Sequence, residues 1–187
     1  KADNREWNIK FSEYDKLPLE FQALRIPITS DWCSLNDERP GYLRLKGKDS
    51  PVSRFNQSVL ARRIQHFNFE VETRVEFDPL VYDHFAGLML RYDESLFYYL
   101  IVTFFPETGE KVLAFMEMEG STFNYIDKIT VLDNSGVCLK AITVDEKITF
   151  YWSPDGKDWN ECGIQRPFDR LCDENAEPVG FTGSFVG

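Results

Sequence analysis

The sequence predicts an all-β sandwich built from antiparallel strands. Residues 67–77 (FNFEVETRVEF) give the clearest signal, because Phe, Val or Thr occupies every second position and polar residues stand between them. That period of two is typical of a strand with one buried and one wet face. Similar short segments recur along the chain, and no segment sustains the 3.6-residue apolar period of a helix.

Nine segments carry the strand signature of β-branched or aromatic residues bounded by turn formers. In chain order they are Phe21–Pro27, Tyr42–Gly47, Phe67–Phe77, Phe85–Tyr92, Phe97–Phe105, Lys111–Met118, Tyr125–Leu132, Val137–Val144 and Lys147–Trp152. Tight turns are predicted at residues 91–95, at 106–109 (PETG) and at 153–156 (SPDG). This spacing indicates a meander of hairpins in two packed sheets.

Nothing in the chain marks a boundary between two folded domains. There is no internal repeat and no linker rich in Pro, Gly or Ser, so we expect residues 1–187 to form one domain. The more polar residues 1–17 are expected to connect it to something upstream.

Composition excludes several classes of partner. The 187 residues are 43% hydrophobic, which suffices for a packed core, and the formal net charge of −10 argues against nucleic acid and against an anionic membrane surface. No apolar run approaches the roughly 20 residues that span a bilayer.

The residues that most often bind metals or form disulfides are sparse. His66 and His84 are too scattered to indicate a metal site, and neither a metal nor another cofactor is expected. The cysteines show no CxxC spacing and are interpreted as free, partly buried thiols, which favours a reducing cytoplasm: Cys33, Cys138, Cys162 and Cys172.

Catalytic motifs are missing. The chain has no GxSxG, no HExxH and no Gly-rich phosphate loop. A pair of carboxylates could hydrolyse a glycoside, but Glu70, Glu72 and Glu76 have the spacing of a solvated sheet face. Residues 133–136 (DNSG) could offer oxygen ligands to calcium, although a plain hairpin loop is the favoured interpretation.

Two tryptophans flank the turn at residues 153–156. Exposed aromatic rings can stack on a sugar, so Trp152 and Trp159 are candidates for a sugar platform. The favoured alternative is that a returning hairpin brings them together as ordinary core and cross-strand partners.

A set of motifs follows a fixed order along the chain: WCSL (32–35), PGYLRLKG (40–47), SRFNQS (53–58), ARRIQHF (61–67), AGL (86–88), FYYL (97–100) and GFTGSFVG (180–187). In that order the motifs resemble the C-terminal β-sandwich of glycoside hydrolase family 43 β-xylosidases, and the similarity covers residues 18–187.

The resemblance implies a concanavalin A-like jelly-roll of two antiparallel sheets. It also implies an N-terminal five-bladed β-propeller as partner, which carries the catalytic aspartate base and glutamate acid for inverting hydrolysis of β-1,4-xylosides, often with arabinofuranosidase activity. None of those catalytic positions lies in this sequence, so the chain alone is not expected to be an enzyme. In the family the sandwich continues with a further acidic loop and strand, so we expect the last strand to be cut off after residue 187 and an edge to be left unpaired.

The resemblance also assigns candidate site residues. One phenylalanine of this domain walls the substrate pocket and favours short xylo-oligosaccharides, and by position it is Phe185, with Phe181 as the alternative. An apolar core or interface anchor is the competing interpretation of either ring.

The polar segment before residue 67 is a candidate interface with the propeller or with another subunit of a homo-oligomer. Its proposed contact residues are Arg54, Gln57, Arg62 and Arg63, because arginines and amides suit partly hydrated contacts. The alternative is that the two adjacent arginines pair with acidic neighbours inside this domain.

Two functions therefore remain open. The chain is either a non-catalytic accessory domain that packs on the propeller and caps its pocket, or an independent carbohydrate-binding module for xylan or xylo-oligosaccharides. Autonomous catalysis is disfavoured by the missing motifs.

Overall fold

The computed structural model describes residues 6–133, 135–176 and 179–187, and the chain divides into two compact units, Lys1–Ala61 and Arg62–Gly187. We call them the N-terminal unit and the sandwich unit. The division falls inside strand β4 (Leu60–Arg63), whose first half pairs with the N-terminal unit and whose second half pairs with the sandwich unit.

The N-terminal unit contains little regular structure. It comprises the 3-10 turn η1 (Phe11–Glu13), the short strands β1 (Gln22–Ala23), β2 (Cys33–Leu35) and β3 (Leu43–Leu45), and the start of β4. Its small core contains Trp32, Cys33 and Leu60, and the Trp32 indole donates a hydrogen bond to the Pro27 carbonyl at 2.9 Å. The N-terminal unit thus has a small hydrophobic core of its own around Trp32, although its strands are short.

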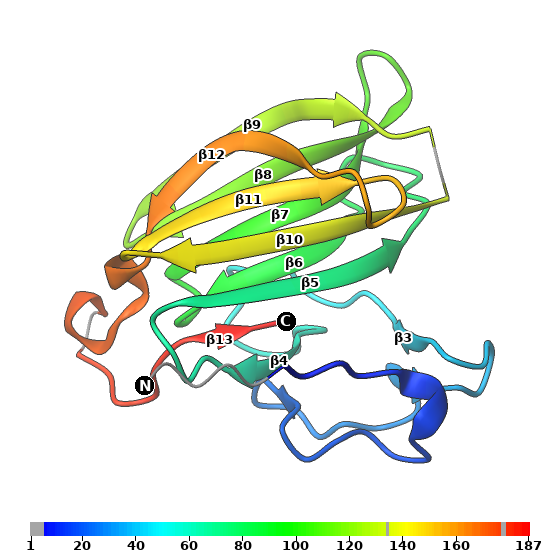
Figure 1. Cartoon of the computed structure of the whole chain (residues 1–187), viewed down its shortest axis with the longest axis horizontal. Helices are drawn as coiled ribbons and strands as arrows, with labels where there is room; N and C mark the ends of the chain where they lie inside the picture. The colour runs from blue at the N-terminus through cyan, green and yellow to red at the C-terminus, as the bar shows by residue number, and fades with distance from the viewer. Residues whose placement is uncertain (1–5, 134, 177–178) are drawn as a thin grey trace. The chain divides into compact units, whose positions relative to one another are not determined.

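The sandwich unit consists of two antiparallel sheets (Figure 1). The larger sheet has the order β4-β13-β6-β7-β8-β9, and the smaller sheet has the order β12-β11-β10-β5. The bounds are β5 (Phe69–Glu76), β6 (Ala86–Arg91), β7 (Leu96–Phe105), β8 (Glu110–Glu119), β9 (Thr122–Val131), β10 (Gly136–Val144), β11 (Lys147–Ser153), β12 (Asn160–Pro167) and β13 (Phe185–Val186). Two 3-10 turns, η2 (Asp169–Leu171) and η3 (Asp173–Asn175), follow β12.

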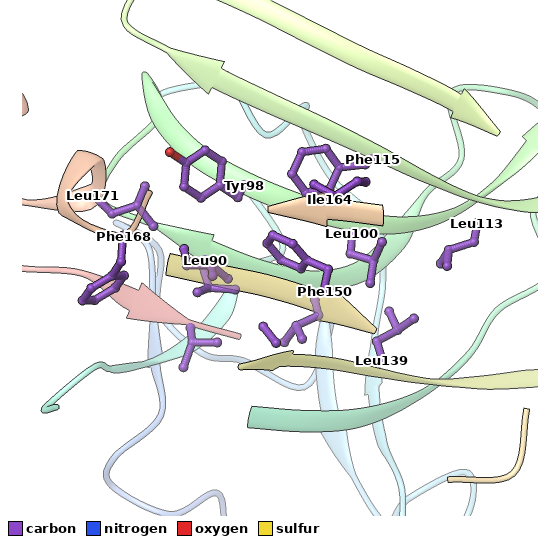
Figure 2. Packing of buried hydrophobic residues seen from close by; sticks show 14 of the residues in the cluster. Leu90, Tyr98, Leu100, Leu113, Phe115, Leu139, Phe150, Ile164, Phe168 and Leu171 are labelled. Carbon is purple, nitrogen blue, oxygen red and sulfur yellow. The ribbon is translucent and has the colours of Figure 1, made fainter. Parts of the chain in front are cut away.

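The core of the sandwich unit lies between these two sheets (Figure 2). Phe115 of the larger sheet and Phe150 of the smaller sheet are almost completely buried, and their ring centroids lie 5.1 Å apart with the planes inclined at 62°. Such edge-to-face pairs stabilise a core beyond the area that they bury. Leu88 and Leu90 stand two positions apart on β6 and both lie in this core. Such a spacing of apolar residues fixes which face of the strand points inward.

The hairpin turns confirm the predicted meander. Gly109 and Gly156 adopt positive φ at the turns predicted for residues 106–109 and 153–156. Between β10 and β11 the two turn residues Asp145 and Glu146 also have positive φ, of 49° and 63°, as a two-residue hairpin loop requires. An all-β fold of two antiparallel sheets is thus confirmed, and each of the nine predicted segments overlaps an observed strand.

The closing strand differs from the expectation of an open edge. β13 lies between β4 and β6, with Phe185 in register with Arg63 on one side and with Arg91 on the other. No unpaired edge lies at this segment, because β13 is hydrogen-bonded on both sides, and the expected further strand after residue 187 stays a prediction. β9 is the edge strand of the larger sheet in this unit.

Candidate functional site

Phe181 projects from the segment that precedes β13. We call residues Gly180–Ser184 the Phe181 loop. The ring of Phe181 is 91% exposed, although large apolar side chains usually lose most of their exposed area on folding. A loop of the sandwich unit therefore presents one phenylalanine to its surroundings.

Phe185 has a different environment. As a residue of β13 it alternates with Val186, which is buried in the core between the sheets, so Phe185 lies on the opposite face of the larger sheet. It is partly buried, and the Arg63 guanidinium lies over its ring at 5.0 Å from the centroid. The structure thus separates the two candidates: Phe181 projects from a loop, and Phe185 packs within the sheet.

The adjacent arginines of β4 point to opposite faces of the sheet. Arg62 is in register with Val186, and Arg63 is in register with Phe185, so each follows the face of its partner. Arg63 donates a hydrogen bond to the Thr182 carbonyl of the Phe181 loop. A single flat partner surface would meet only one of these two side chains.

The other two predicted interface residues lie in the N-terminal unit. Arg54 is exposed beside Phe55, whose ring is 61% exposed, and the Arg54 carbonyl accepts a hydrogen bond from Arg25 at 2.7 Å. Gln57 is only 1% exposed. Its amide donates to the carbonyls of Ser50 at 2.9 Å, Pro51 at 2.7 Å and Ser53. Gln57 therefore holds its own loop together, and Arg54 and Phe55 are among the exposed residues of that loop.

The carboxylates of β5 are paired with cations of the same sheet. Lys140 of β10 binds Glu70 at 2.7 Å and Glu72 at 3.3 Å, and its ammonium lies 4.0 Å from the centre of the Trp159 ring. Burial alone would lower the pKa of Lys140, but the two carboxylates outweigh it and raise the pKa. Glu76 pairs with Arg74 at 3.2 Å. These contacts stabilise the outer face of the smaller sheet, as the spacing of the glutamates indicated.

The two tryptophans that flank the SPDG turn are both partly buried. Trp152 packs against the core of the sandwich, which is the favoured alternative from the sequence. Trp152 also lines a pocket of about 220 Å³ together with Val131, Leu132, Val137 and Pro154. Its apolar lining offers few groups that could orient a sugar.

Sequence reasoning missed one aromatic pair, in which one ring is exposed and the other, that of Tyr125, is partly buried against the cluster that contains Phe97. Phe123 and Tyr125 stand two positions apart on β9, with ring centroids 6.3 Å apart and planes inclined at 13°, and Phe123 is 51% exposed. Their alternation on an edge strand was visible in the sequence, since residues i and i+2 share a face. Without the sheet order, however, nothing showed that this face lies at an edge.

Metal ligands do not gather among the described residues: no group of three or more His, Cys, Asp or Glu side chains could hold an ion there. Residue 134 of the 133–136 segment lies outside the described residues. The four cysteines are free thiols, and burial raises the pKa of Cys162 to about 12. Within the described part of the chain, no helix is long and apolar enough to cross a membrane.

Comparison with known proteins identifies this architecture. The family described as the β-xylosidase C-terminal concanavalin A-like domain matches residues 8–187. The chain belongs to that family. It is therefore a C-terminal accessory domain of the type found in glycoside hydrolase family 43 β-xylosidases, and its concanavalin A-like fold is confirmed.

Named relatives agree with this assignment. The chain is 36% identical over 166 residues to a xylan 1,3-β-xylosidase of Vibrio sp., covering 88% of this chain and 31% of that protein. It is 34% identical over 179 residues to a β-xylosidase of Bacillus subtilis strain 168, covering 94% and 33%. The crystal structure of a xylan β-1,4-xylosidase from Bacillus halodurans C-125 superposes with a TM-score of 0.87 at 33% identity, covering 100% of this chain and 36% of that chain. The chain thus spans about a third of the length of the curated relatives that it matches.

Proposed function

We propose that this chain is a non-catalytic accessory domain of a β-xylosidase, which packs on the catalytic domain and caps its substrate pocket. Phe181 carries the proposal. A phenylalanine that is 91% exposed at the tip of a loop has a ring face available to contact a bound sugar or a partner surface. Phe185 lies in β13 with the Arg63 guanidinium over its ring, so it does not project from the loop.

The carboxylates of this chain support a non-catalytic role. Glycosidases need two carboxyl groups that face one substrate, with distinct protonation states. Glu70 and Glu72, two of the three glutamates considered from the sequence, share one lysine as a common partner. The catalytic carboxylates are accordingly proposed to lie in a separate catalytic domain, an inverting β-propeller.

The surface around Arg54 is proposed to contact that catalytic domain or a second subunit. Arg54 and Phe55 are exposed together, and arginine beside an aromatic ring is typical of the centres of protein interfaces. In the sandwich unit, Arg63 is proposed to form a separate contact through the Phe181 loop, whose Thr182 carbonyl accepts its hydrogen bond. The substrate is proposed to be a short xylo-oligosaccharide. The linkage stays open, since the named relatives include both a 1,3- and a 1,4-xylosidase.

The test uses the protein in which this chain is joined to its catalytic domain. Phe181→Ala should raise KM for xylobiose about tenfold, because truncation removes one stacking face from the pocket. Phe67→Ala is the matched control, since it removes another exposed phenylalanine that lies outside the Phe181 loop. Equal KM values for the wild type and Phe181→Ala would refute the capping role.

An independent carbohydrate-binding module is the second candidate, and the Phe123–Tyr125 pair favours it. Nearly parallel rings on an exposed strand edge can stack on successive sugar units. The 187-residue chain alone should then be retarded on a native gel that contains xylan, and Phe123→Ala should abolish the retardation. Equal migration with and without xylan excludes this function.

A further inference from the structure

The Phe181 loop is held on both sides of its exposed ring. The Gly180 amide donates to the Asp173 carbonyl at 3.4 Å, and the Gly183 amide donates to the Asp173 carboxylate at 3.2 Å. Beyond the ring, the Ser184 hydroxyl donates to the Leu171 carbonyl. The Ser184 carbonyl in turn accepts from the Ile64 amide at 2.9 Å. The residues on both sides of Phe181 are therefore hydrogen-bonded, while the side chain of Phe181 itself is exposed to solvent.

Tyr92 connects this loop to the core. Its ring belongs to the cluster between the sheets and is 6% exposed, and its hydroxyl donates to the Asp173 carboxylate at 2.6 Å. The Thr182 amide approaches the same hydroxyl at 3.5 Å. A Cβ atom added to Gly180 would lie 1.7 Å from the hydroxyl oxygen, so the chain passes directly over it only because residue 180 is glycine.

Asp173 is the centre of the network. One carboxylate oxygen accepts from both the Tyr92 hydroxyl and the Gly183 amide, and Arg63 adds a nearby positive charge. The bond from Tyr92 is the largest cause of a lowered pKa of Asp173, and the bond from the Gly183 amide acts in the same direction. The ionised carboxylate is thus the form that the loop binds.

We propose that Tyr92 and Asp173 are positioning residues that hold the Gly180–Ser184 loop in one conformation and so present Phe181 to the substrate. This inference rests on the proposed capping function. An unrestrained loop would lose conformational entropy each time its ring packed on a sugar, and this cost would weaken binding. A loop that is already ordered by its hydrogen bonds to the core avoids this loss of conformational entropy. This explains why hydrogen-bonded residues flank a side chain that itself makes no core contact.

The first test examines the loop in the 187-residue chain itself. Tyr92→Phe keeps the ring in the core and removes only the hydroxyl, so amide exchange at Thr182 and Gly183 should accelerate about tenfold. Asp173→Ala should have the same effect by a second route. Tyr98→Phe is the matched control, because it removes another buried hydroxyl, which donates to the Pro167 carbonyl at 3.1 Å and not to this loop. Unchanged exchange in both Tyr92→Phe and Asp173→Ala would overturn the inference.

The second test separates positioning from general stability, in the protein joined to its catalytic domain. Tyr92→Phe should raise KM for xylobiose about fivefold and leave kcat within about twofold, since binding and not chemistry loses its preorganised group. In a Phe181→Ala background the same substitution should change KM no further, because the hydroxyl acts only through that ring.

Each outcome decides one of the two claims. A Tyr92→Phe effect that persists in the Phe181→Ala background would show a merely structural role and overturn the inference. So would a normal KM in Tyr92→Phe when Phe181→Ala is impaired. If Phe181→Ala itself is silent, the proposed capping function fails, and the amide-exchange result alone then decides whether Tyr92 and Asp173 fix the loop.

Discussion

The ion pair between Glu117 and Arg166 joins the two sheets inside the sandwich. Substituting either residue should lower the free energy of unfolding, and the loss should differ between the two substitutions. Glu117 lies on β8 and Arg166 on β12. The guanidinium binds the carboxylate through two nitrogens, with Nη2 at 3.1 Å from Oε1, and it also lies 5.4 Å from the centre of the Phe115 ring. The side chain of Glu117 is 10% exposed and that of Arg166 is 28% exposed.

This difference in exposure sets the expected magnitudes. Removing one partner of a fully buried pair costs about 3–5 kcal/mol, because the other charge stays behind without compensation. Arg166→Met keeps apolar contact with the ring and leaves the more buried carboxylate without its cation, with the Asn124 amide at 3.2 Å still donating to it, so we expect a loss of about 3 kcal/mol, at the lower end of that range. Glu117→Gln leaves the more exposed guanidinium, which water can reach, and should cost about 1–2 kcal/mol.

Urea unfolding followed by tryptophan fluorescence measures both losses. The double variant, Glu117→Gln with Arg166→Met, should be about 2 kcal/mol more stable than the sum of the single losses predicts, since no unpaired charge remains. Lys128→Met is the control, because its ion pair with Glu110 is solvent-exposed and should contribute less than about 1 kcal/mol. The reasoning is refuted if Arg166→Met costs no more than Glu117→Gln, or if the two single losses simply add.

Three further predictions concern single residues. Burial raises the pKa of Cys162 to about 12, so this thiol should resist alkylation at pH 8, where only about one molecule in ten thousand is ionised. Because the unfolded thiol ionises near pH 9 and the folded one near 12, the free energy of unfolding should fall as the pH rises from 9 towards 12. Gly180→Ala should lower stability by about 1–3 kcal/mol through the clash with the Tyr92 hydroxyl, whereas Gly47→Ala, where an added Cβ meets nothing within 4 Å, should change stability by less than about 0.5 kcal/mol in thermal unfolding. The bond from Tyr92 lowers the pKa of Asp173, so the order of the Phe181 loop should be retained above the ordinary aspartate pKa of 3.8 and lost as the pH falls below it, measured as amide exchange corrected for its intrinsic rate.

The sequence predicted the long strands well for a physical reason. In β5 a wet and a buried face alternate, so the pattern of residues 69–76 records the sheet directly. β7 and β8 are buried over most of their length, and their aromatic and β-branched content marks them without any alternation. The ends of these strands are also marked in the sequence, because turns such as those at Gly109 and Gly156 adopt positive φ, which favours glycine.

Strands β4 and β13 could not be predicted as easily. β4 reads LARR and β13 contains only Phe185 and Val186, so neither segment carries a period of its own. Their pairing comes from tertiary structure, since β13 is placed between strands that lie about 95 and 120 residues earlier in the chain. β12 was anticipated only as the strand that returns after the turn at residues 153–156, without bounds, because Gly163 and a register shift interrupt its pattern.

The candidate site was predicted only in outline. Sequence similarity favoured Phe185 by position and kept Phe181 as the alternative, whereas the function proposed from the structure uses Phe181, because both are phenylalanines of one short segment and their environments differ only in the folded chain. Their difference depends on the sheet register and on the Tyr92–Asp173 bond, which joins residues 81 positions apart. The opposite directions of Arg62 and Arg63 likewise required knowledge that they lie in a strand.

The most direct test of the accessory role is hydrolysis of an aryl β-xyloside by three samples: this chain alone, the catalytic domain alone, and the two mixed. We expect no turnover by this chain alone, and a rate for the mixture above that of the catalytic domain alone. Turnover by this chain alone would contradict the account and return attention to its own carboxylates. A mixture no faster than the catalytic domain alone would contradict the proposal that this domain completes the pocket.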